Sequence, residues 1–72
     1  MKTRYKYINF QTTMRDNVWL ICNNKKRDHL GYVSFYKPRK RYCSNMFDGV
    51  VFDASCHRDI ADFLDQLNEV KK

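Results

Sequence analysis

Glycine and proline are scarce in this chain of 72 residues, which has two Gly and one Pro. A chain with so few of them has no flexible linker or low-complexity segment, and its length fits one domain, residues 1–72. No run of about 18 apolar residues is present, so no transmembrane helix is expected. The opening MKTRYKYINF is basic, but no apolar stretch follows it, so no signal peptide is expected either.

The sequence also lacks the spacings that mark metal centres and catalytic sites. The widely spaced Cys22, Cys43 and Cys56 predict free, mostly buried thiols in the cytoplasm rather than a disulfide framework. No C-x₂-C or H-x₃-H pair accompanies His29 and His57, so neither a metal nor another cofactor is expected. Cys56 and His57 are adjacent, but neighbouring residues on a helix point about 100° apart. We therefore expect no enzyme.

Positive charge is in excess and is concentrated in the first part of the chain. Residues 1–45 hold 11 basic and two acidic side chains, a balance of +9. Residues 46–72 hold three basic and six acidic side chains, a balance of −3, which gives the net +6. Such a distribution predicts one face that attracts anions; the alternative is a solvated surface whose two parts partly neutralise each other.

The last third of the chain predicts an amphipathic helix over about residues 54–70. Its apolar residues recur at the helical period: Cys56, Ile60, Phe63, Leu64, Leu67 and Val70. Asp53 or Ser55 can supply the N-cap oxygen, and Lys71 and Lys72 stand where the helix dipole favours cations.

The preceding residues, about 3–52, predict strands. Runs rich in β-branched and aromatic residues cover 3–11, 17–23, 29–36 and 40–47. The pair Asp48-Gly49 predicts a tight hairpin into one more short strand at 50–52. The sequence therefore predicts an α+β fold: an antiparallel meander of four to five strands with one C-terminal amphipathic helix packed on one face.

Side chains alternate between the two faces of a strand, and this period assigns residues to the side under the helix or to the open side. In the third and fourth strands we expect Val33, Phe35 and Cys43 under the helix, and Tyr32, Tyr36 and Tyr42 on the open face. In the first strand Tyr5 and Tyr7 alternate with Arg4 and Lys6, and either set can face solvent.

Cations and tyrosines gather at the predicted hairpin Tyr36-Lys-Pro-Arg-Lys-Arg-Tyr42. Cations bind phosphates, and tyrosine rings stack on bases. The candidate nucleic-acid-binding residues are Tyr32, Tyr36, Lys37, Arg39, Lys40, Arg41 and Tyr42, together with Arg4 and Lys6. The alternative is a charged hairpin tip that prevents edge-to-edge aggregation. The cluster Lys25-Lys26-Arg27 is typical of a solvated turn.

Part of the chain resembles a family of small proteins of bacteriophages and prophages. The resemblance rests on Gly31-Tyr-Val-Ser-Phe-Tyr36, Arg41-Tyr42-Cys43, Asp48-Gly49, Phe52, Cys56 and Asp59-Ile-Ala-Asp-Phe63. It covers roughly half of the chain and departs at Lys37-Pro-Arg-Lys40, where a more aromatic stretch is expected. The resemblance implies a phage origin and the cytoplasm of a bacterial host, but no activity. The meander-plus-helix plan is also similar to single-stranded-DNA-binding transcription-cofactor domains, a likeness of fold alone.

Two functions of different classes follow. The first is a non-catalytic module whose basic, tyrosine-bearing sheet face binds single-stranded nucleic acid or a nucleotide. The alternative is a phage counter-defence inhibitor, of the anti-CRISPR type or similar, that binds a host defence protein or its RNA or nucleotide ligand. We expect no membrane partner. We expect a homodimer, because one helix covers only one face of the sheet and edge strands need partners; Trp19 belongs to the core or to that interface.

Overall fold

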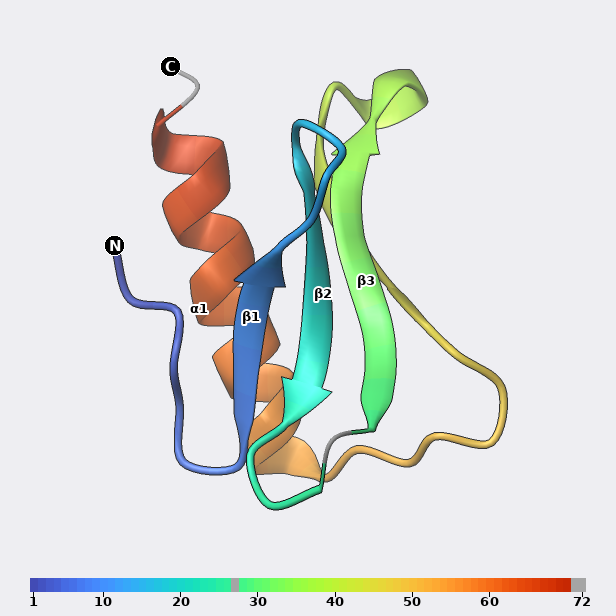
Figure 1. Ribbon diagram of the computed structural model, residues 1–72. Helices are drawn as coiled ribbons and strands as arrows, with labels where there is room; N and C mark the ends of the chain where they lie inside the picture. Colours follow the sequence, from blue (N-terminus) through green and yellow to red (C-terminus); the bar gives the residue numbers. More distant parts are fainter. Residues whose placement is uncertain (27, 71–72) are drawn as a thin grey trace.

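Residues 1–26 and 28–70, which the computed structural model describes, form four antiparallel strands, a short 3₁₀ helix and one α-helix (Figure 1). In chain order they are β1 (Ile8–Thr12), β2 (Val18–Asn23), β3 (His29–Tyr36), η1 (Lys37–Arg39), β4 (Arg41–Met46) and α1 (Ala54–Val70). The strands lie in the order β1-β2-β3-β4, so the predicted meander is confirmed. The predictions on Arg27, Lys71, Lys72 and the Val70 side chain lie outside the described residues.

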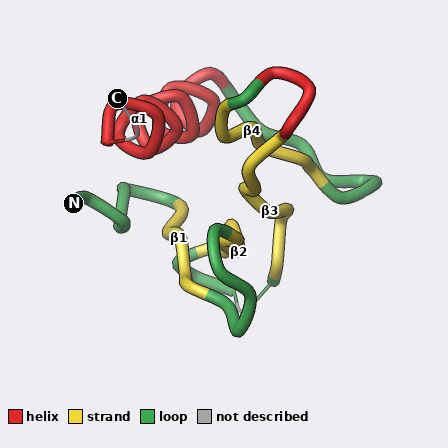
Figure 2. The backbone as a smooth tube through the Cα atoms, turned by 90° about the horizontal axis from the view of Figure 1, so that it is seen from above, coloured by secondary structure: helices red, strands yellow, loops and turns green. Residues whose placement is uncertain are grey.

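The sheet is curved, and α1 lies on its inner side next to β4 (Figure 2). The buried stripe of α1 consists of Ile60, Phe63 and Leu67 at helical spacing, as predicted. Asp53 Oδ1 caps the helix by accepting the Cys56 N–H at 3.0 Å and the Ser55 hydroxyl at 3.0 Å. These bonds hold the pKa of Asp53 below its ordinary value, since they stabilise the carboxylate.

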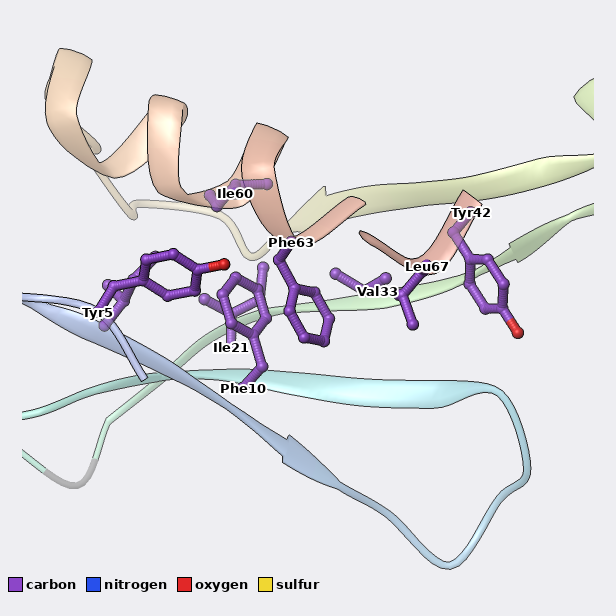
Figure 3. Close-up of a cluster of buried hydrophobic side chains, with 9 residues drawn as sticks. Tyr5, Phe10, Ile21, Val33, Tyr42, Ile60, Phe63 and Leu67 are labelled. Carbon is purple, nitrogen blue, oxygen red and sulfur yellow. The ribbon is translucent and has the colours of Figure 1, made fainter. Parts of the chain in front are cut away.

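Stacked aromatic rings form the centre of the core between α1 and the sheet (Figure 3). The Phe63 ring of α1 lies flat on Phe10 of β1, with centroids 3.9 Å apart and planes 6° apart. The Trp19 indole meets Phe63 edge to face at 5.1 Å, which assigns Trp19 to the core. Phe63, Ile21 and Val33 are fully buried. The helix is therefore attached to three strands by side chains from each.

The N-terminal strand is shorter than predicted, because the chain reverses within residues 3–11. Tyr5 N–H donates to the Ile8 carbonyl at 2.8 Å and Phe10 N–H to the Thr3 carbonyl at 2.8 Å, so residues 3–5 fold back along β1. Because of this turn, residues 4–7 do not alternate between the two faces of a strand as expected. Tyr5 is buried in the core, and its hydroxyl donates to Asp62 Oδ2 of α1 at 2.7 Å, whereas Tyr7 is exposed.

The predicted fifth strand at 50–52 is absent from the described chain, where residues 47–53 form the loop into α1. Gly49 has a φ of 82°, as a turn requires, but the chain after it does not pair with β4. Asn68 of α1 bonds to the outer edge of β4 instead, accepting the Tyr42 N–H at 2.8 Å. The helix therefore lies where a fifth strand would pair.

Candidate nucleic-acid interface

Strand register assigns each side chain to the face under α1 or to the opposite face, here called the open face. Residues directly opposite each other in an antiparallel pair share a face. Three rows on the open face follow: Gln11, Leu20, Tyr32 and Asn45; Val18, Ser34 and Cys43; Tyr36 and Arg41. These three rows run from the middle of the sheet to the tip of the β3–β4 hairpin.

The hairpin tip has a backbone that keeps its cations exposed. Pro38 stands in the first turn of η1, where its fixed φ fits a helical start. Lys40 adopts the left-handed conformation with φ 52°, and its N–H closes the turn on the Lys37 carbonyl at 3.0 Å. The exposed side chains are Lys37, Arg39, Lys40 and Arg41. We call residues 36–41 the basic hairpin.

No carboxylate belongs to the hairpin that carries these cations. The sequence from His29 to Phe47, which includes β3, η1 and β4, holds four Lys and Arg residues and no Asp or Glu. The carboxylates of α1, among them Asp59, Asp62 and Asp65, lie on the helix that packs against the other face. The charge asymmetry of the sequence thus separates by element, with the cations on the β3–β4 hairpin and the carboxylates on α1, which lies beside β4.

Two of the three tyrosines predicted on the open face, Tyr32 and Tyr36, lie there. Tyr36 is 51% exposed and directly opposite Arg41, so a ring and a guanidinium share one face. Tyr32 is half-buried two rows further along the open face, with its ring 6.2 Å from that of Phe47. Aromatic rings beside cations are the elements that single-stranded nucleic-acid sites combine.

The prediction for Tyr42 is wrong. Tyr42 is 4% exposed and lies opposite Phe35 on the helix side, and its hydroxyl donates to Asn17 Oδ1 at 2.7 Å. Cys43, predicted under the helix, lies opposite Ser34 on the open face. The cause is the length of the turn, because four residues between Tyr36 and Arg41 set the β4 register one residue away from the expected one.

The remaining predictions for this surface have mixed outcomes. Val33 is fully buried under α1, as predicted, and Phe35 shares its side but is 38% exposed near the hairpin tip.

Arg4 pairs with Asn9 at the far end of the sheet. Since β3 has eight residues, about 23 Å separate its ends, and Arg4 does not join the basic hairpin. Lys6 lies in the N-terminal turn, with Nζ 5.3 Å from the Tyr7 ring centre.

Sequence reasoning missed a polar pocket at the far end of the open face. Arg4, His29 and several carboxamide side chains line a pocket of about 340 Å³ between the N-terminal turn and the β2–β3 turn. The clearest sequence signal for it is Asn23-Asn24, beside the lysines of the β2–β3 turn.

The cysteines and histidines are dispersed. All three cysteines are unpaired, as predicted, with Cys22 buried and the other two half-buried. Burial raises the pKa of the Cys22 thiol, and burial followed by the nearby Asp53 raises that of Cys56, which disfavours reactive thiolates. The His57 ring meets Phe52 edge to face. Within residues 1–26 and 28–70 no three His, Cys, Asp or Glu side chains gather as metal ligands.

No protein-family model matches this chain, and neither does any curated protein or any solved structure. In the described part of the chain, no helix has the length and apolar character needed to cross a membrane.

Proposed function

We propose that this protein is a non-catalytic binding module whose open face and basic hairpin bind single-stranded nucleic acid. One observation carries the proposal: four exposed cations lie on a hairpin without carboxylates, and Tyr36 is directly opposite one of them, Arg41. The cations would neutralise phosphates and release counterions, while Tyr36 and Tyr32 would stack on bases. Tyr42 has no part in the proposed surface because its side chain is buried.

The test measures how binding depends on salt. Fluorescence anisotropy with labelled oligothymidylate and oligouridylate, starting at about 50 mM salt, gives the slope of log affinity against log salt concentration. The combined variant Arg39→Gln, Lys40→Gln and Arg41→Gln should lower that slope by about 2 to 3, because each phosphate contact contributes about 0.7 to 0.9. Failure of the unmodified protein to bind either oligonucleotide would refute the proposal.

A matched control separates the hairpin from net charge. The variant Lys2→Gln, Lys25→Gln and Arg58→Gln removes the same charge from three exposed positions outside the hairpin. If the hairpin makes the phosphate contacts, this variant should retain most of the salt-dependence slope of the unmodified protein. Equal losses in the two triple variants would show that only the overall charge attracts the strand.

A second candidate is a phage counter-defence inhibitor that binds a host protein in the cytoplasm. The observation in its favour is the exposure of three large apolar side chains after the hairpin: Met46 at 51%, Phe47 at 41% and Val51 at 92%. Exposed apolar side chains are more typical of protein contacts than of phosphate contacts. Its test is Val51→Ser with Met46→Ser, which should leave oligonucleotide binding unchanged and abolish binding to a protein partner.

Dimerisation remains a prediction. Residues 3–5 pair with the outer edge of β1, and Asn68 bonds to that of β4, so edge pairing between two copies has less room than the sequence indicated. The open face is the remaining surface for a second copy. Sedimentation at high micromolar concentration, with and without oligonucleotide, distinguishes a dimer from a monomer whose open face takes nucleic acid.

A further inference from the structure

A second polar surface lies on the open face, at the opposite end from the basic hairpin. The register places Arg4 opposite Asn9, Asn9 opposite Cys22, and Cys22 opposite His29. Because directly opposite residues share a face, Arg4, Asn9 and Cys22 form one row. The register shifts between Ile21 and Cys22, and the pocket lining, which includes both Cys22 and His29, extends this row to β3. The pocket of about 340 Å³ lies along this row, and its volume is in the range of small-molecule sites.

A network of carboxamides holds the pocket wall in place. Asn24 connects two turns: its backbone N–H donates to the Tyr7 carbonyl at 2.9 Å and its side-chain NH₂ to the Tyr5 carbonyl at 2.7 Å. Its Oδ1 accepts from Asn9 Nδ2 at 2.7 Å, and Gln11 Nε2 donates to Asn9 Oδ1 at 3.1 Å. Asn9 is 9% exposed, so the wall is fixed before any ligand arrives.

The pocket is rich in hydrogen-bond donors. Asn23 Oδ1 accepts the backbone N–H groups of Lys25 at 2.8 Å and Lys26 at 3.2 Å. The acceptor of this carboxamide is thus used by the loop, and its NH₂ group keeps two hydrogens for a ligand. Arg4 and Lys26 add positive charges, and none of the described lining residues is a carboxylate. This lining fits an anion.

We propose that this pocket binds a phosphate monoester of mononucleotide size. Arg4 would contact two phosphate oxygens with its planar fork, and Lys26 would supply a point charge. The Asn23 NH₂ group would donate to the third oxygen. The pocket exceeds the size of a bare anion, so the rest of the ligand would contact Gln11 and His29. A free mononucleotide and the 5′-phosphorylated end of a single strand both carry this group, and the site does not depend on the basic hairpin.

The test is an NMR titration of the ¹⁵N-labelled full chain with AMP, inorganic phosphate and adenosine. AMP should shift the backbone amides of Asn9, Asn23 and Asn24, phosphate should bind the same site more weakly, and adenosine should not bind measurably. Arg4→Gln should lower AMP affinity about tenfold or more, because it removes a charge-assisted pair of hydrogen bonds. Adenosine binding as tightly as AMP, or unchanged AMP affinity in Arg4→Gln, would overturn the proposal.

Control variants separate this site from folding and from the hairpin. Arg58→Gln, an exposed position on α1, should leave AMP affinity unchanged. The hairpin triple variant should also bind AMP with unchanged affinity. A failure of the nucleic-acid proposal therefore does not refute the phosphate pocket. If Arg4→Gln lowers the melting temperature, Lys26→Gln serves as the test variant instead, since the Lys26 side chain is exposed in a turn. Unchanged AMP affinity in Lys26→Gln would count against the proposed site.

Oligonucleotides identify the source of the phosphate. Tighter binding of a 5′-phosphorylated oligothymidylate than of its 5′-hydroxyl form, lost in Arg4→Gln, would assign the pocket to strand ends. Equal binding of the two forms, with AMP binding that depends on Arg4, would assign it to free mononucleotides. Either result supports the proposed site. The proposal is refuted if every phosphorylated ligand binds the unmodified protein and Arg4→Gln with the same affinity.

Discussion

The two faces of the sheet differ in what their rows of side chains contain. On the side under α1, Phe10, Ile21 and Val33 are buried at 4% exposure or less and contact one helix. On the open side, the row Tyr36 and Arg41 ends in an exposed hairpin, and the row that includes Arg4 and Asn9 lines a pocket. The same two-residue period thus separates the core residues from those of the two proposed binding surfaces, since each strand contributes to both faces.

This separation implies that stability and binding should respond to different substitutions. Residues facing α1 should change the free energy of unfolding and leave ligand affinity intact in the folded protein. Exposed residues on the open face should do the reverse.

Phe63→Ala should have the largest effect on stability. Phe63 is fully buried, stacks on Phe10 and meets Trp19 edge to face, so the substitution opens a cavity in the middle of the core. The expected loss is about 3–5 kcal/mol of the free energy of unfolding, enough to unfold many small domains. Urea unfolding followed by Trp19 fluorescence measures it. A loss below about 1 kcal/mol would show that α1 is not packed on the sheet as described.

Gly31→Ala should disturb the contact between β3 and β4. A Cβ atom at Gly31 would overlap the backbone oxygen of Asn45 and lie 3.1 Å from Met46 Cα, and backbone atoms cannot rotate away as a side chain does. We expect a loss of about 1–3 kcal/mol in the free energy of unfolding, typical of an overpacked site. Faster hydrogen exchange at β4 amides should accompany it. Gly49→Ala is a useful comparison, because nothing lies within 4 Å there and only its φ of 82° opposes the change.

The helix and the meander could be predicted from the sequence because each depends on a local period. Ile60, Phe63 and Leu67 follow the helical period without interruption, and Asp53 marks the start. The register of β4 could not be predicted, because it depends on a four-residue turn closed by Lys40 in the left-handed conformation. Lysine gives no sign of that conformation, whereas glycine or asparagine would have done so.

The sequence gives even less indication of the N-terminal turn and of the pocket than of the β4 register. The chain reverses after Tyr5 without a Gly or Pro, so the pattern continued to resemble one strand through Phe10. The pocket unites Arg4, Asn9 and His29, which are far apart in sequence and meet only through the pairing of four chain segments. Patterns of residues predict elements well, but a site built across rows requires the register.

A pair of tyrosine variants tests the two faces with the same residue type. Tyr36→Ala should weaken oligonucleotide binding by about 1–3 kcal/mol through lost stacking, with little change in stability. Tyr42→Phe should cost about 0.5–1.5 kcal/mol of stability, because Asn17 loses a hydrogen bond, and should leave binding unchanged. Anisotropy and urea unfolding of both variants provide the comparison. Reduced oligonucleotide affinity in folded Tyr42→Phe would return this residue to the binding surface.

The smallest effect appears only in alkali and concerns Tyr5, the residue that attaches the N-terminal segment to α1. Burial, followed by the hydrogen bond to Asp62 and its negative charge, raises the pKa of Tyr5 far above the ordinary value of 10.0. Since the folded state keeps this proton longer than the unfolded state, the associated stability is fully present below about pH 10 and is lost as the pH rises above it.

The free energy of unfolding should therefore fall more steeply between about pH 10 and 11.5 in the unmodified protein than in Tyr5→Phe, which has no proton to lose. Comparing the two proteins cancels the exposed tyrosines and lysines that both contain. The measurement is a series of urea titrations at fixed ionic strength, and parallel curves would mean that folding does not raise the pKa of Tyr5. As a control, Tyr7→Phe removes an exposed hydroxyl two residues away and should leave the slope of the unmodified protein unchanged.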